Sequence, residues 1–165
     1  MKTLLLIRHA KAEPQGFSQK DFDRSLNERG RKDAVTMSKR LIKKNIKLDA
    51  FISSSAERAK ETAVLFAKEF GKKKKEVVLI DELYLATSEI FYKAISSTND
   101  SFDHIALVSH NPGIAEFANT LTNVRIDDMP TCSVFVVKIH CKTWKEFAEA
   151  KKEFLLFDFP KNTVL

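Results

Sequence analysis

The chain has 165 residues, 44% of them hydrophobic and 30% charged, and its 28 Lys and Arg exceed its 22 Asp and Glu for a formal net charge of +6. This length predicts a single domain over residues 1–165 that can bury a core without metal or disulfide staples. The composition excludes a disordered or fibrous chain, and the apolar runs fall well short of the roughly 18 residues of a membrane span, so we expect no membrane contact. Two cysteines, Cys132 and Cys141, are too few for a disulfide framework and favour a reducing, cytoplasmic compartment.

The chain opens with an apolar run at residues 4–7. This run begins like a signal peptide, but Arg8 and His9 end it too early, so we expect a buried strand. Residues 10–24 are polar and are expected to form a loop. A helix with one apolar face should then start near Ser25 or Asn27.

A second strand is expected over residues 48–53, followed by a helix that one of Ser53, Ser54 and Ser55 caps. Apolar residues in that helix recur at helical spacing up to Gly71, which is expected to end it. A third strand over residues 77–80 and a helix over 88–95, capped by Ser88, follow.

The last part of the chain predicts strands at residues 105–108, 133–139 and 153–159. A helix should follow the first of them after residue 113, and a short helix is expected over 143–150. Strands that alternate with helices indicate an α/β fold with a mostly parallel sheet. Ligands of such open sheets bind at the carboxyl edge of the strands.

Two histidines and two arginines are expected at that edge. Arg8 and His9 follow the first strand, His110 follows the strand at 105–108, and Arg58 lies near the start of the helix after the second strand. Arginine forks match phosphate oxygens, and a helix N-terminus near Asn111 would add backbone donors. The pattern indicates an anion site.

Other interpretations of these residues remain open. A lone histidine or arginine after a strand is usually a satisfied polar residue. A zinc site fits poorly, because the sequence has no close HxH or HExxH spacing and two guanidinium groups would repel a cation. His104 and His140, at strand ends, are interpreted as structural or solvated.

The segments at residues 8–11, 21–30, 53–63, 81–84 and 108–113 together resemble the histidine phosphatase superfamily, founded on the cofactor-dependent phosphoglycerate mutases. They occur in the family's order over about residues 2–140, and they resemble in particular its short SixA-type phosphohistidine phosphatase branch. Ala10 replaces the superfamily's usual glycine, as it often does in that branch. Ser25 and Ser55 stand where relatives often have proline.

The resemblance implies a three-layer α/β/α fold of the phosphoglycerate mutase type. It also implies that His9 is a nucleophile that forms a phosphohistidine intermediate, while Arg8, Arg58 and His110 hold the phosphoryl oxygens. It implies no metal and no cofactor, and a phosphate or sulfate ion should fit the same site.

The leaving-group acid and the substrate contacts are weaker predictions. Glu82 is the candidate acid by position, and its alternative is a solvated loop carboxylate. Arg24, Lys11 and Asn111 are candidate substrate-binding residues, although isolated loop charges contribute little. A phosphohistidine substrate leaves as imidazole and needs no strong protein acid, which favours N–P over O–P bonds.

The expected function is therefore a phosphatase for phosphohistidine on a protein. The alternatives are a metal-independent phosphomonoesterase for a small metabolite or sugar phosphate, and a non-catalytic phosphate-binding module. Nucleic-acid binding has only the charge of +6 in its favour, without a recognition motif. The run Lys72 to Lys75 is short for an interaction tail and is interpreted as a solvated turn.

Overall fold

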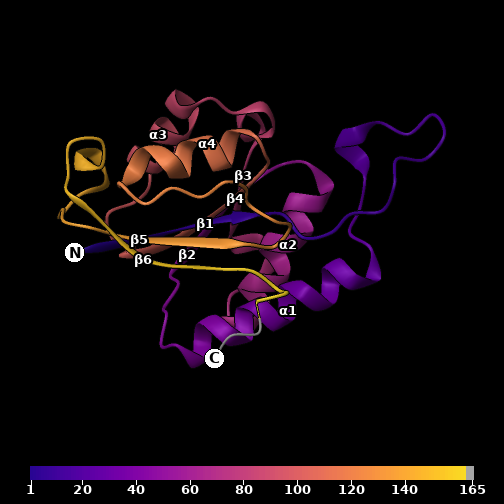
Figure 1. Cartoon of the computed structure of the whole chain (residues 1–165), viewed down its shortest axis with the longest axis horizontal. Coiled ribbons are helices and arrows are strands. Elements are labelled where there is room, and N and C mark those ends of the chain that lie inside the picture. Colours follow the sequence, from indigo (N-terminus) through magenta and orange to yellow (C-terminus); the bar gives the residue numbers. More distant parts are fainter. Residues whose placement is uncertain (163–165) are drawn as a thin grey trace.

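A computed structural model describes residues 1–162, so the last three residues of the predicted domain 1–165 lie outside it. Helices cover both faces of one central sheet (Figure 1). The strands are β1 (Lys2–Arg8), β2 (Ala50–Ser54), β3 (Val77–Ile80), β4 (His104–Ser109), β5 (Val134–Ile139) and β6 (Lys152–Asp158). The α-helices are α1 (Glu28–Lys43), α2 (Glu57–Glu69), α3 (Ser88–Ser96) and α4 (Gly113–Leu121). Short 3-10 helices lie at Asp21–Asp23, Lys74–Glu76, Asp81–Leu85 and Trp144–Glu146.

The six-stranded sheet has the order β3-β2-β4-β1-β5-β6. The pairs β3–β2, β2–β4 and β4–β1 are parallel, and the pairs β1–β5 and β5–β6 are antiparallel. The predicted α/β class and the mostly parallel sheet are thus confirmed, with an antiparallel end that the sequence did not indicate. β1 and β4 lie inside the sheet and are covered on both faces, which explains their unbroken apolar runs.

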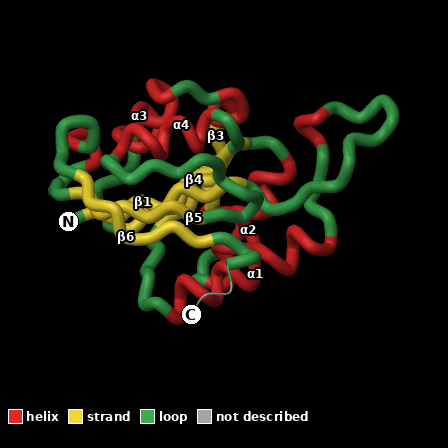
Figure 2. The backbone as a smooth tube through the Cα atoms, in the orientation of Figure 1, coloured by secondary structure: helices red, strands yellow, loops and turns green. Residues whose placement is uncertain are grey.

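Two apolar cores lie on opposite faces of the sheet. Successive side chains of a strand point to opposite faces, so Leu4 and Leu6 pack with α3 and α4, whereas Leu5 and Ile7 pack with α1 and α2. Figure 2 shows the same three layers, with the loop between β1 and α1 projecting beyond the carboxyl ends of the strands. Among the described residues, no helix is both long and apolar enough to cross a membrane.

Some predicted helix starts are confirmed and others are wrong. Asn27 caps α1, and its side chain accepts a hydrogen bond from the Gly30 amide. No serine caps α2, because β2 extends through Ser54 and places Ala56 at the cap position. Thr87 rather than Ser88 precedes α3.

The predicted end of α2 is confirmed, whereas the helix predicted before β6 is wrong. Gly71 follows α2 with a φ of 77°, the left-handed conformation that glycine adopts readily. The predicted helix over residues 143–150 is wrong: its start is a 3-10 turn at Trp144–Glu146. The Trp144 amide donates to Asp100 and its indole to the Phe102 carbonyl, and these contacts fix the turn against the core.

Candidate active site

The adjacent parallel strands β1 and β4 bring two histidines together. Arg8 pairs with Ser109 at the ends of these strands, so the next residues, His9 and His110, lie side by side. Their ring centroids are 5.1 Å apart, and both side chains are buried. Arg58, in the first turn of α2, is buried against them. The structure therefore brings these predicted residues to one place at the carboxyl edge.

Hydrogen bonds fix the orientation of the His9 ring. Its Nδ1 lies 2.8 Å from the Ala10 carbonyl oxygen, which can only accept, so Nδ1 carries the proton. The other nitrogen, Nε2, keeps its lone pair and accepts a hydrogen bond from Arg58 Nε at 3.3 Å. Burial lowers the pKa of His9 to about 3, with His110 and Arg58 contributing to the same shift and the hydrogen bond to Ala10 opposing it. The ring is thus a neutral imidazole whose Nε2 points into the site.

The backbone beside His9 is anchored to α2. The Ala10 amide donates to Thr62 Oγ1 at 3.0 Å, and the Thr62 hydroxyl donates to the Arg58 carbonyl at 2.7 Å. Ala10 and Thr62 are both fully buried. This threonine couples the loop after β1 to the helix that carries Arg58, and no local pattern in the sequence marks its role.

His110 contacts the end of β2. Its Nε2 lies 2.8 Å from Ser54 Oγ. Burial lowers the pKa of His110 to about 3, with the Arg58 charge as the next cause. Its Nδ1 is buried and has no hydrogen-bond partner among the described residues.

Asp21 is the carboxylate that holds Arg58. Arg58 donates from Nη1 to the Asp21 carbonyl at 2.8 Å and from Nη2 to Asp21 Oδ2 at 3.0 Å. Tyr84 donates its hydroxyl to the same Oδ2, and Arg24 Nε donates to Oδ1 at 2.9 Å. The Tyr84 hydrogen bond, with that of Arg58, lowers the pKa of Asp21 to about 2. Asp21 is therefore ionised, and no periodicity in the loop sequence marks it.

Arg8 and Asn111 share one backbone acceptor. Arg8 Nη1 donates to the Met129 carbonyl at 2.9 Å, and Asn111 Nδ2 donates to the same oxygen at 3.0 Å and to Asp128 Oδ1 at 3.1 Å. Burial lowers the pKa of Arg8. Arg8 Nε and Asn111 Oδ1 are buried and lack partners within residues 1–162. The amide hydrogens of Asn111 thus face the loop before β5.

The remaining predicted residues lie farther from the histidine pair. Glu82 is exposed, and Tyr84 is the residue of that turn that reaches the site, with its ring 5.3 Å from that of His110. Lys11 is exposed, and its side chain makes no hydrogen bond or ion pair with the described part of the chain. Arg24 is engaged by Asp21 and by the Glu13 carbonyl at 3.1 Å.

The site combines a neutral imidazole with the buried guanidinium of Arg58, the half-buried guanidinium of Arg8 and a second histidine. Such a site suits a tetrahedral oxyanion, because the guanidinium hydrogens can bind its oxygens while the Nε2 lone pair faces its centre. Across residues 1–162, no group of three or more His, Cys, Asp or Glu side chains is arranged to hold a metal ion.

Comparisons with known proteins agree with this geometry. The model of the histidine phosphatase superfamily (branch 1) matches residues 4–89. An uncharacterized chloroplastic protein of Arabidopsis thaliana is 29% identical over 154 residues, which cover 88% of this chain and 70% of that protein. A structure from Agrobacterium tumefaciens assigned as phosphohistidine phosphatase SixA superimposes with a TM-score of 0.78 at 25% identity and covers 94% of this chain and 96% of its own. The protein histidine phosphatase SixA in complex with tungstate gives a TM-score of 0.82 at 16% identity, covering 97% and 98% of the two chains.

Proposed function

Because this chain belongs to the histidine phosphatase superfamily, we propose that it is a phosphatase for phosphohistidine on a protein and works through a phosphohistidine of its own. One observation carries the proposal: the unprotonated Nε2 of buried His9 faces Arg58 at 3.3 Å, beside His110. The Agrobacterium structure assigned as SixA supports the choice of substrate class.

His9 acts as the nucleophile. Its Nε2 attacks phosphorus, and the N–P bond of the substrate breaks with its electron pair going to the substrate nitrogen. The substrate ring already carries a proton on its other nitrogen, so it leaves as neutral imidazole. Water then attacks the phosphoryl group on His9, which releases phosphate and restores the free Nε2. In the first step Arg58 Nε–H loses its acceptor on His9, so the same hydrogen turns to a phosphoryl oxygen.

Arg8, Arg58 and His110 hold the phosphoryl oxygens. Arg8 Nε and His110 Nδ1 are buried without partners in the described structure, and each can bind an oxygen of the phosphoryl group. The amide hydrogens of Asn111 are used by Asp128 and Met129, so we assign Asn111 to positioning the loop that also holds Arg8.

The environment of the carboxylates favours an N–P bond as the substrate. Asp21 is ionised at neutral pH because its pKa lies near 2, so it does not supply a proton to a leaving group. Glu82 is exposed and points to no partner among residues 1–162, and the proposed mechanism does not use it. A phosphohistidine imidazole can be protonated on its own near neutral pH, whereas an alkoxide leaving group needs an acid.

Turnover on matched substrates tests the proposal. We expect the protein to hydrolyse a phosphohistidine peptide with a kcat/KM at least tenfold above that for p-nitrophenyl phosphate or a sugar phosphate. His9→Ala should abolish turnover, and quenched reactions of the native protein should contain an acid-labile phosphoryl group on His9. The exposed His140→Ala serves as the control. A preference for a sugar phosphate would instead establish the phosphomonoesterase, and phosphate binding without turnover would establish the non-catalytic module.

A further inference from the structure

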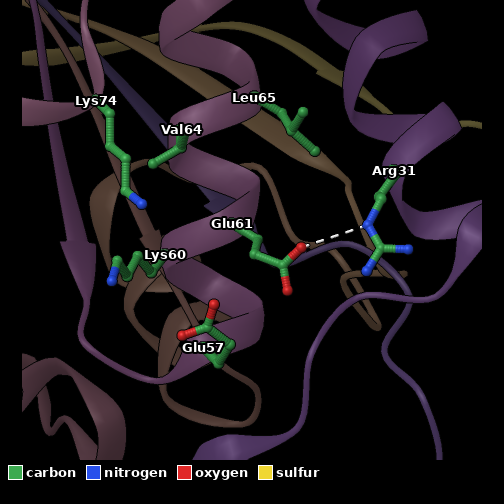
Figure 3. A pocket seen from close by; sticks show the side chains of 7 residues that line it. All are labelled: Arg31, Glu57, Lys60, Glu61, Val64, Leu65 and Lys74. Atoms are coloured by element: carbon green, nitrogen blue, oxygen red, sulfur yellow. Dashed lines mark ion pairs between the residues drawn. The ribbon is translucent and has the colours of Figure 1, made fainter.

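A groove outside the active site runs over the outer side of α2. Two adjoining hollows share Lys60, Val64 and Lys74, and together they extend from α1 across α2 to β3. Figure 3 shows the first hollow, with Lys60, Val64 and Lys74 on one side of α2 and Arg31 on the other. The second hollow adds Lys75, Val77 and Leu79.

The half of the groove toward β3 has an apolar floor and a basic rim. Leu79 is 42% exposed on this floor. The side chains of Lys60, Lys74 and Lys75 make no ion pair or hydrogen bond with the described residues, although Glu57 lines the same groove near Lys60. Toward α1, by contrast, Arg31 is paired with Glu61 at 3.5 Å. The positive charge on the β3 side is therefore left for a partner.

β3 is an edge strand. It pairs with β2 on one side, and its outer side has no neighbouring strand among residues 1–162. Val78 on this strand is 53% exposed. A free strand edge with apolar side chains accepts an extended segment by backbone hydrogen bonds, and flanking charges select its sequence.

The groove lies along a strand that ends at the active-site edge of the sheet. β3 is parallel to β2, so both strands end at the edge that carries His9 and Arg58. The turn Asp81–Leu85 follows β3 directly and places Tyr84 against His110. An extended chain advances about 3.3 Å per residue, so a segment bound along β3 enters the site a few residues beyond its contact with the lysines.

We propose that this groove binds an acidic, extended segment of the protein whose phosphohistidine the active site hydrolyses. The proposal rests on the proposed function for the identity of the substrate. The charge complementarity selects the occupant: carboxylates pair with Lys60, Lys74 and Lys75, and alternate apolar side chains pack on Val64 and Leu79.

Binding of an unphosphorylated probe tests the groove by itself. A fluorescent peptide that alternates Glu with Val is compared with one that alternates Gln with Val, by anisotropy at low salt. We expect the native protein to bind the Glu peptide about tenfold more tightly, from three surface ion pairs of ordinary strength. Reversal of the groove charges by Lys60→Glu, Lys74→Glu and Lys75→Glu should abolish this preference.

A second triple variant controls for net charge. Lys43→Glu, Lys44→Glu and Lys145→Glu make the same charge change at exposed sites outside the groove and should keep the preference for the Glu peptide. Equal binding of the two peptides to the native protein would overturn the proposal. So would an equal loss in both triple variants, or displacement of the peptide by an oligonucleotide at lower concentration.

Turnover separates this proposal from the function on which it rests. Phosphohistidine peptides with and without an acidic run should differ about tenfold in KM for the native protein and for the control variant, with similar kcat. The groove variant should hydrolyse both equally. If neither peptide is hydrolysed while the binding preference persists, the proposed function fails and the acidic-segment site stands. If both are hydrolysed with the same KM, the groove proposal fails and the function stands.

Discussion

Buried neutral histidines should make the stability of this protein depend on pH. Burial lowers the pKa of His110 from its ordinary value of 6.5 to about 3, and that of His9 also from 6.5 to about 3. Below pH 6.5 the unfolded chain takes up protons at these rings and the folded chain does not. The folded state is therefore fully favoured above the unfolded pKa and loses stability as the pH falls.

The size of the loss follows from the difference between the two pKa values. Between pH 7 and pH 5, one such histidine lowers the free energy of unfolding by roughly 2 kcal/mol, since about 1.36 kcal/mol accumulates per pH unit below the unfolded pKa. Any folded-state pKa well below 5 gives nearly the same value. His110→Gln keeps a polar group near Ser54 and should remove this share of the pH dependence.

Urea unfolding at the two pH values, followed by the fluorescence of the single tryptophan, Trp144, measures the effect. For an m-value of about 2 kcal/mol/M, the fall in midpoint between pH 7 and pH 5 should be about 1 M smaller in His110→Gln than in the native protein. His140→Gln removes an exposed imidazole outside the site, serves as the matched control, and should keep the native difference. If His110→Gln also keeps that difference, His110 is not held neutral by burial.

Three further substitutions test the contacts around Arg58 and the loop before α1. Asp21→Asn weakens the charge-assisted hydrogen bond that orients Arg58, so kcat/KM for p-nitrophenyl phosphate should fall about tenfold. The urea midpoint should fall as well, because buried Arg58 loses the charge of its partner. Thr62→Val removes the hydroxyl bonded to the Arg58 carbonyl, and urea unfolding should show a loss of about 1–2 kcal/mol. Gly30→Ala places a Cβ 2.1 Å from the Lys11 carbonyl oxygen, and the same measurement should show a loss of about 2–3 kcal/mol.

Each of these three predictions has a control variant whose result can contradict it. Asp21→Glu keeps the charge and should recover part of the activity, so equal loss in both Asp21 variants would show that charge is not what holds Arg58. Thr62→Ser keeps the hydroxyl and should lose less stability than Thr62→Val. Gly16→Ala meets only the Gln19 side chain at 3.3 Å, and a loss as large as that of Gly30→Ala would refute the steric argument.

The sequence predicted correctly the elements that have a clear apolar pattern and whose conformation is not altered by contacts with distant residues. The strand at residues 77–80 is found with the predicted bounds, and the strand at 105–108 is extended by one residue at each end. The errors fall where long-range contacts override local preference. Trp144 has its indole fixed on the Phe102 carbonyl, and the expected helix is reduced to a turn. Ser54 remains in its strand and contacts His110, so it does not cap α2.

The candidate site shows the same division. The sequence predicted four residues of the site: Arg8, His9, Arg58 and His110. Each follows an apolar strand or lies near the start of a helix, and in a parallel sheet these positions meet at the carboxyl edge of the strands. Asp21 begins a short 3-10 helix in the segment between β1 and α1, and nothing local shows that its carboxylate faces a helix that follows much later in the chain. For the same reason, Glu82 was predicted as the acid from its position after the third strand. The turn that follows this strand places Tyr84 in the site instead.

The central place of β1 has a consequence for how the chain folds during synthesis. β1 leaves the ribosome well before its two neighbours in the sheet, β4 and β5, which follow much later in the sequence. Its apolar side chains therefore lack their strand partners until those segments are made, a situation that slows folding and exposes nascent chains to aggregation. His9 meets His110 only when β4 docks beside β1, so no fragment that ends before β4 can contain the assembled site. Appearance of the oxyanion pocket would thus report that β4 has docked beside β1.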